Sequence, residues 1–153
     1  MQFPGEEIIT FAVRLEENGH AFYSAAAELF QYPHDCKNLF LDLAEKEVMH
    51  IAICQKLAEN FKLEIPEIRK EEHADSLHRL CETHIFGEKD SGARRIKTIE
   101  TPKQALEIAY QFEIDCVSFY SELAKLTRFD SRHLIRQIIR EEKEHAAEIK
   151  RFL

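Results

Sequence analysis

Three Glu-x-x-His pairs occur in this chain of 153 residues, and in a helix each pair would place a carboxylate and an imidazole one turn apart on the same face. Carboxylate oxygens and imidazole nitrogens bind iron and manganese and also accept zinc. The pairs are Glu17/His20, Glu47/His50 and Glu142/His145. Chance alone produces such pairs in a chain with 28 acidic residues and 8 His. Their position relative to the apolar pattern therefore decides whether they lie inside the fold.

Apolar residues recur at alternating steps of three and four along four long segments, and each of these stripes has a glutamate near its middle. The four glutamates are Glu16, Glu47, Glu113 and Glu142. Two of the Glu-x-x-His pairs lie on their stripes, so His50 and His145 share the same buried face one turn further on. Glu17 lies about 100° further round its helix, among polar residues, which makes the third pair accidental.

Four glutamates at one depth of a helical core indicate either bound cations or a wrong register. Ionised carboxylates are expensive to bury without a partner, and four that converge repel one another by several kcal/mol. Two divalent cations would neutralise them and would take the two imidazoles as further ligands. The alternative is that the stripes are out of register and that some of the glutamates face solvent. Because the pattern occurs in all four segments, we favour the metal pair.

The two halves of the chain repeat one another. Residues 15–24 align with residues 112–121 at an offset of 97, which pairs Glu16 with Glu113 and Tyr23 with Tyr120. The two Glu-x-x-His pairs on the stripes align at an offset of 95. The difference of two residues falls in the connections between helices, where insertions are tolerated.

The elements that must position these side chains are long helices. Periodicity predicts helices over residues 5–32, 35–61 and 102–127, a fourth from 130 or 131 to the end, and a shorter one within residues 66–86. Thr101 and Gln104 form a capping box, and Asp130 or Ser131 would cap the fourth long helix. Short connections predict two antiparallel hairpins, and the roughly 40 residues between them can cross the whole bundle. We therefore expect an all-α four-helix bundle, as a single domain over residues 1–153.

Composition excludes several classes of protein. The net charge of −7 and the lack of a basic stripe argue against nucleic-acid binding, and 32% charged residues argue against a membrane protein. The acidic N-terminus has no apolar segment of a signal peptide, so we expect a cytoplasmic protein. The four cysteines are scattered, with no Cys-x-x-Cys, which predicts free thiols and no zinc ribbon or rubredoxin-type iron site within this chain.

These residues resemble the ferritin-like di-iron proteins, most closely the rubrerythrin-like branch without a rubredoxin domain. One Glu from each of two helices and Glu-x-x-His from each of two others is the ligand set of that class. The resemblance covers the four long segments, and it implies a ferritin-like four-helix bundle with two iron ions, for which manganese or zinc could substitute. The implied metal ligands are Glu16, Glu47, His50, Glu113, Glu142 and His145, with Glu47 and Glu142 as the bridges. It also implies that Tyr23 hydrogen-bonds Glu113 and that Tyr120 hydrogen-bonds Glu16.

Two departures from the family pattern concern the reaction. Rubrerythrins with a Cys-rich electron-transfer domain carry their own electron donor, so this chain would need an external donor such as rubredoxin. They also have a further Glu three residues after the ligand in the third long helix, and here that position is Cys116. A seventh protein ligand, and the peroxidase cycle that depends on it, are therefore in question.

Three functions remain open on the sequence alone. The first is a di-iron oxidoreductase that reduces hydrogen peroxide or dioxygen with electrons from a separate protein. The second is a ferroxidase that serves iron storage or buffering, and the third is a metal-stabilised helical sensor or adaptor without enzymatic activity. The first two share one site and differ in whether an external reductant sustains turnover.

Five further features complete the expectations. His20 is expected to be partly exposed, and the cysteines one turn after His50 and Glu113 to be small buried fillers. Gly19, in mid-helix, either leaves room for a small oxidant or admits a bulky neighbour. The crossover holds three His and a Cys, which we do not expect to form a zinc site. Apolar residues outside the stripes predict a homodimer that buries some of them. These are Phe11, Phe22 and Phe119.

Overall fold

The computed structural model describes residues 5–60, 70–127 and 129–153, and these parts of the chain are almost entirely helical. Four long helices and two shorter ones follow one another along the chain. They are α1 (Gly5–Leu29), α2 (His34–Asn60), α3 (Lys70–Thr83), α4 (Ser91–Ile96), α5 (Pro102–Leu126) and α6 (Phe129–Phe152). The predicted all-α fold is confirmed.

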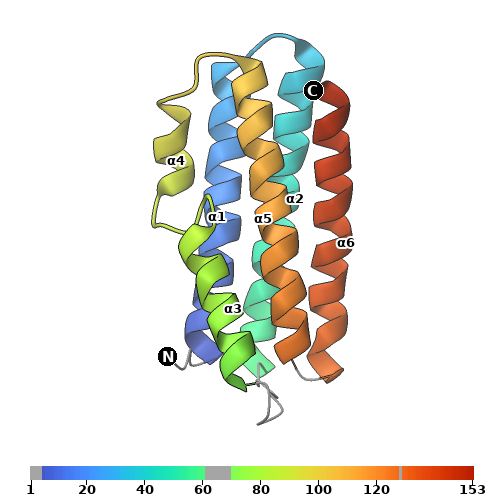
Figure 1. Ribbon diagram of the computed structural model, residues 1–153. Coiled ribbons are helices and arrows are strands. Elements are labelled where there is room, and N and C mark those ends of the chain that lie inside the picture. The colour runs from blue at the N-terminus through green and yellow to red at the C-terminus, as the bar shows by residue number, and fades with distance from the viewer. Residues whose placement is uncertain (1–4, 61–69, 128) are drawn as a thin grey trace.

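The four long helices run side by side as a bundle, in which α1 with α2 and α5 with α6 form the two antiparallel hairpins (Figure 1). The segment between the hairpins crosses from one end of the bundle to the other. It carries α3 against α5 and α4 against α1, so both short helices lie on the side of the bundle formed by α1 and α5 (Figure 1). The side formed by α2 and α6 has no such cover among the described residues.

The helix boundaries follow local chemistry where the chain supplies a cap. The Thr101 hydroxyl accepts from the Gln104 N–H at 3.2 Å, and the Gln104 side chain accepts from the Thr101 N–H, which completes the predicted capping box. The predicted cap of α6 is wrong, because this helix already begins at Phe129 and Asp130 lies in its first turn. Helix α1 ends at Leu29 instead of Tyr32, since the residues before a proline disfavour the helical conformation.

The crossover is fastened to the middle of α1. The Asn18 side chain donates to the carbonyls of Phe86 and Glu88, both at 2.8 Å. Gly92 lies so close to α1 that a Cβ atom there would approach the Asn18 carbonyl oxygen to 2.0 Å. The six-residue helix α4, which the sequence did not predict, is held in this place by contacts with α1 and not by an amphipathic pattern of its own.

The surplus aromatic residues lie inside the protein. Phe22 and Phe119 are fully buried, and the half-buried Phe11 packs on Phe119 with ring centroids 5.4 Å apart. Phe22 and Phe119 thus pack within the bundle and Phe11 is partly covered, so these residues offer little surface to a second copy, and the homodimer stays a prediction. Gly19 admits a bulky neighbour, since a Cβ atom there would lie 2.5 Å from the ring of Phe112.

No helix within the described residues is long and apolar enough to cross a bilayer.

Candidate metal centre

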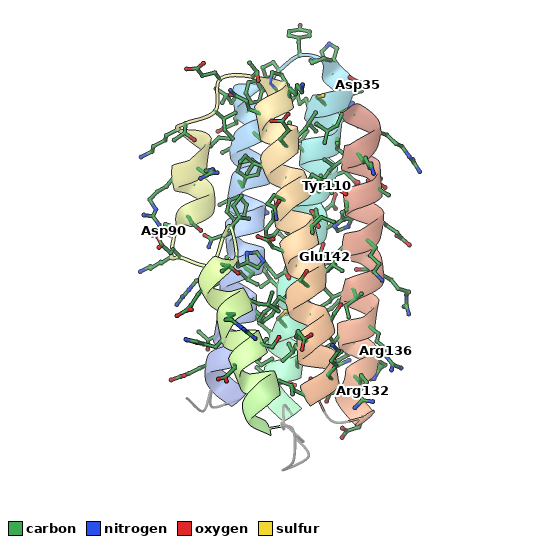
Figure 2. The ribbon with its side chains drawn as sticks, in the orientation of Figure 1. Asp35, Asp90, Tyr110, Arg132, Arg136 and Glu142 are labelled. Atoms are coloured by element: carbon green, nitrogen blue, oxygen red, sulfur yellow. The ribbon has the colours of Figure 1, made fainter. Side chains whose placement is uncertain are left out.

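Four glutamates, one from each long helix, meet in the core of the bundle. Glu16 comes from α1, Glu47 from α2, Glu113 from α5 and Glu142 from α6, and each is 0% exposed. In Figure 2, Glu142 lies near the middle of the bundle, whereas Arg132 and Arg136 of the same helix lie near its N-terminal end. The register taken from the apolar stripes is therefore correct, and Glu17 is exposed.

The buried carboxylates and imidazoles form two overlapping groups. Ligand atoms of Glu16, Glu47, His50 and Glu142 all lie within 4.8 Å of one another. The same limit holds for Glu47, Glu113, Glu142 and His145. Glu47 and Glu142 belong to both groups, and each remaining Glu and each His belongs to one. The structure thus brings all six predicted ligands together in the arrangement that two adjacent metal ions would need.

The inward-facing atoms of this cluster lack hydrogen-bond partners. They are Oε2 of Glu16, both carboxylate oxygens of Glu47, Nδ1 of His50, Oε2 of Glu113 and Oε1 of Glu142. A buried polar atom without a partner costs free energy, and a concentrated set of acceptors has no satisfactory arrangement without cations or protons. Oxygen and imidazole donors fit divalent iron or manganese. The residues present therefore fit a pair of such ions.

The outward-facing atoms are held in place by other side chains. Tyr23 donates a hydrogen bond to Oε1 of Glu113, and Tyr120 donates one to Oε1 of Glu16. Each tyrosine thus fixes one oxygen of a carboxylate and leaves the second oxygen turned inward. These are the two cross-bundle contacts that the family resemblance implies.

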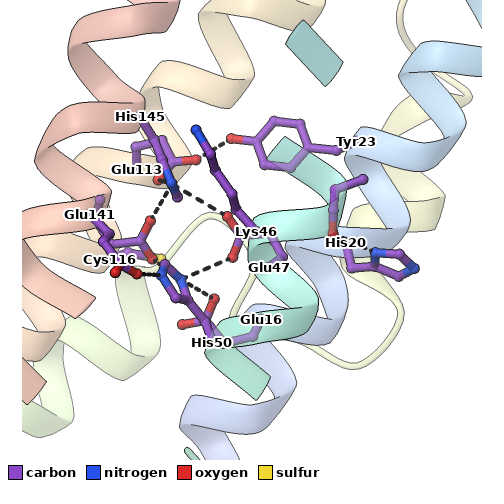
Figure 3. A network of polar contacts seen from close by, with 12 residues as sticks. Glu16, His20, Tyr23, Lys46, Glu47, His50, Glu113, Cys116, Glu141 and His145 are labelled. Carbon is purple, nitrogen blue, oxygen red and sulfur yellow. Dashed lines mark hydrogen bonds and ion pairs between the residues drawn. The ribbon is translucent and has the colours of Figure 1, made fainter. Parts of the chain in front are cut away.

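The two imidazoles face each other across the cluster, with ring centroids 5.5 Å apart (Figure 3). Nδ1 of His50 lies 3.3 Å from Oε1 of Glu142 and 3.5 Å from Oε2 of Glu16. Nδ1 of His145 lies 2.9 Å from Oε2 of Glu142 and 3.4 Å from Oε2 of Glu113. In both rings the same nitrogen points at the carboxylates, as two related metal ligands would.

Glu141 is the partner of His50 that sequence reasoning missed. Nε2 of His50 donates to Oε2 of Glu141 at 2.8 Å, and Gln137 donates to Oε1 at 3.1 Å. Burial acts to raise the pKa of Glu141, but these two hydrogen bonds and the charge of His50 outweigh it and lower the pKa. Its position directly before Glu142 was a signal that it lies close to the cluster. In the structure it lies on the side of α6 that adjoins α2.

Without cations, the cluster must hold protons. Burial, followed by repulsion from the neighbouring carboxylates, raises the pKa of Glu47 and of Glu142 well above the ordinary value. Burial would lower the pKa of His50, but Glu142, Glu16 and Glu47 surround it and raise the pKa instead. A divalent ion that binds here has to displace these protons, so metal affinity depends on pH.

Two cysteines lie beside the cluster, but neither belongs to the two groups of candidate ligands. The Cys54 thiol donates to the Tyr120 hydroxyl at 3.4 Å, because that hydroxyl uses its own proton on Glu16. The sulfur of Cys116 lies 3.5 Å from Nε2 of His84. Burial raises the pKa of both thiols, which keeps them protonated at neutral pH. All four cysteines are free.

The remaining histidines in the described parts stay outside the cluster. Nδ1 of His20 donates to the carbonyl of Ala44 at 2.9 Å, and its half-buried ring lies beside the cluster and not within it (Figure 3). His78 pairs with Glu82 at 3.0 Å, whereas His84 turns inward to Cys116. These contacts do not gather the crossover His and Cys into a zinc site, and the side chain of His73 lies outside the described residues.

Comparisons with known proteins identify the family but no individual relative. Neither the curated proteins nor the solved structures yield a match to this chain. The family model for rubrerythrin matches residues 7–153, which include every residue of the carboxylate cluster and all of the four long helices except the first two residues of α1. The chain therefore belongs to the rubrerythrin family.

Proposed function

We propose that this protein is a di-iron oxidoreductase that reduces hydrogen peroxide or dioxygen with electrons from a separate donor protein. The observation that carries this proposal is the set of unpartnered carboxylate and imidazole atoms, which point inward in two groups that share Glu47 and Glu142. A pair of ferrous ions bound there would supply the two electrons that cleavage of an O–O bond requires.

The side chains have separate tasks in this proposal. Glu47 and Glu142 would supply oxygen ligands to both metal ions, while His50 and His145 would each supply a nitrogen ligand to one. Tyr23 and Tyr120 fix the carboxylates of Glu113 and Glu16, and these phenols keep their protons because burial raises the pKa of both. A fixed set of ligands does not have to rearrange when the metal charge changes, which favours repeated redox cycles.

Reduction of hydrogen peroxide to two molecules of water also consumes two protons, which must come from solvent or from groups at the site. The hydroxyls of Tyr23 and Tyr120 and the imidazole of His145 are hydrogen-bonded to the carboxylates of the cluster. Tyr120→Phe removes one of these hydroxyls and releases one oxygen of Glu16. We expect this variant to bind iron with lower affinity and to react more slowly with peroxide.

Turnover with an external donor tests the proposal. Iron-loaded protein is mixed with reduced rubredoxin and hydrogen peroxide, and donor oxidation is followed optically. The proposal predicts that oxidation continues over many equivalents of peroxide, and that zinc-loaded protein, which has no redox chemistry, gives none. If donor oxidation stops after one equivalent per metal pair, while added ferrous iron restores oxygen consumption, the protein is a ferroxidase for iron storage. If iron and zinc forms behave alike, it is a non-enzymatic protein.

We also propose that the chain functions as a homodimer in the cytoplasm. Helix α2 presents an exposed apolar stripe at Leu41, Val48 and Met49, which are 49%, 48% and 60% exposed, and a second copy of the chain could cover it. The four free thiols accord with a reducing compartment. Light scattering tests the dimer, with Val48→Asp as the variant expected to dissociate it and Glu45→Gln on the same helix as the control.

A further inference from the structure

A pocket of about 710 Å³ opens on the surface of the crossover, between the end of α3 and helix α4. Cys81 and His84 line it from the α3 side, and Arg94, Arg95 and Thr98 line it from the α4 side. The proposed reduction of peroxide uses none of these residues. All of its lining residues belong to the crossover, which packs on α1 and α5 (Figure 1).

His84 is one of the few buried residues that line this pocket. It is only 7% exposed, so most of its ring is inside the protein. Its Nδ1 accepts the backbone N–H of Phe86 at 3.1 Å, which places the proton of the neutral ring on Nε2. Phe11 and Phe112 contact the ring edge to face, with centroids 6.4 and 5.9 Å away. One hydrogen bond and two aromatic contacts thus hold the His84 ring in place.

The carboxylate cluster lies on the inner side of the His84 ring, beyond Cys116. Nε2 of His84 faces the sulfur of Cys116 at 3.5 Å, and Cys116 is fully buried one helical turn after Glu113. Cys116 and Glu113 share the buried face of α5, which places the contact between Cys116 and His84 beside the cluster. Two side chains therefore separate the pocket from the candidate metal centre.

Other side chains cover the cluster from other directions. Towards α2 and α6, the Glu141 carboxylate, which is 35% exposed, contacts His50 at 2.8 Å, and Lys46 spans to Glu148 at 3.7 Å. Towards the end of the bundle where α5 begins, buried rings pack around Tyr23, including Phe40 at a centroid distance of 6.4 Å. From the pocket, a small molecule would meet the His84 ring first and the Cys116 thiol behind it.

We propose that this pocket is the access site for a small uncharged oxidant, hydrogen peroxide or dioxygen, and that the His84 ring is the gate between the pocket and the metal centre. This inference rests on the proposed function for the identity of the oxidant. Four buried carboxylates disfavour anions, and the close packing around Cys116 excludes molecules much larger than peroxide.

Thiol labelling of the metal-free protein tests the gate without any catalytic activity. Methyl methanethiosulfonate, a small uncharged reagent, is applied to the wild type and to His84→Ala, and the modification of each cysteine is followed by peptide mass spectrometry. Cys116 reports on the route behind His84, and the equally buried Cys54 reports on general opening of the bundle. We expect His84→Ala to raise the Cys116 rate at least about tenfold relative to Cys54, because truncation leaves a cavity that the surroundings fill only in part.

Two further variants separate a gate from a loosened crossover. His84→Phe keeps a ring of similar size and should leave Cys116 protected. Phe86→Ala removes a buried crossover ring that does not line the pocket, and should change Cys116 and Cys54 alike. The proposal is wrong if Cys116 and Cys54 respond equally to His84→Ala, if neither responds, or if His84→Phe exposes Cys116 as much as His84→Ala does. None of these outcomes depends on bound metal, so a failure of the proposed function is detected separately by metal analysis and donor turnover.

Discussion

Glu141→Gln should weaken one of the two metal sites and leave the other almost unchanged. The Glu141 carboxylate accepts from Nε2 of His50, whose Nδ1 faces the group that contains Glu16. An ionised acceptor polarises the imidazole, fixes its orientation and makes Nδ1 a better ligand. The hydrogen bond and ion pairs of His145 go to Glu142, Glu47 and Glu113, so its site should lose much less affinity.

The size of this effect follows from the exposure of the carboxylate. Loss of such an outer partner costs roughly 10- to 100-fold in metal affinity. The Glu141 side chain is 35% exposed, and a Gln oxygen can still accept from His50, so the lower end applies. We expect about a tenfold loss, or about 1.4 kcal/mol, at the His50 site.

Anaerobic titration with ferrous or cobaltous ion measures the two successive dissociation constants, and crystals at limiting metal show which site fills first. Glu144→Gln, which makes the same change of charge at an exposed position of α6, is the control and should stay within about 0.5 kcal/mol of the wild type. Equal weakening of both sites, or none, would refute the role of Glu141.

Three other perturbations give clear expectations. Glu16→Ala should sharply lower metal occupancy and peroxide reactivity, whereas Glu17→Ala, at an exposed position, should change stability by no more than about 0.5 kcal/mol. Iron analysis of both variants checks this, and retention of iron by Glu16→Ala alone would overturn the ligand assignment. Gly19→Ala gains about 1 kcal/mol of helix propensity, but its Cβ atom would lie 2.5 Å from the ring of Phe112. Urea denaturation should therefore show a net loss of about 1 kcal/mol in the free energy of unfolding, and a gain would show that this ring can move. The metal-free protein should lose stability as pH rises from about 5 to 8, because the raised pKa values of Glu47 and Glu142 mean that folding takes up protons. Thermal melts should show this loss for the metal-free protein and not for the metal-loaded protein.

The sequence predicted the parts of the fold that repeat with helical periodicity. The stripes placed Glu16 inside and Glu17 outside, because adjacent helical positions differ by about 100° and only one face of the helix packs against the core. The capping box at Thr101 was also predictable, since both of its hydrogen bonds lie within four residues. Pairing between the tyrosines and the glutamates came from the family resemblance, because nothing local to one helix specifies its partner across the bundle.

What the sequence did not reveal depends on contacts between distant segments. The hydrogen bonds of Asn18 to the crossover join residues about 70 positions apart, and no sequence pattern around either partner predicts the other. Helix α4 is too short for periodicity to detect. His84 was indistinguishable from the other crossover histidines, since only the packing of the crossover on α5 turns its ring towards Cys116.

Crystallography of protein loaded anaerobically with ferrous iron, with anomalous diffraction recorded at the iron edge, locates the metal ions themselves. We expect two iron ions per chain, both in contact with Glu47 and Glu142. One should also contact Glu16 and His50, and the other Glu113 and His145. A fully loaded protein with a single ion, with ions elsewhere, or with these carboxylates turned away from the metal would refute the di-iron site.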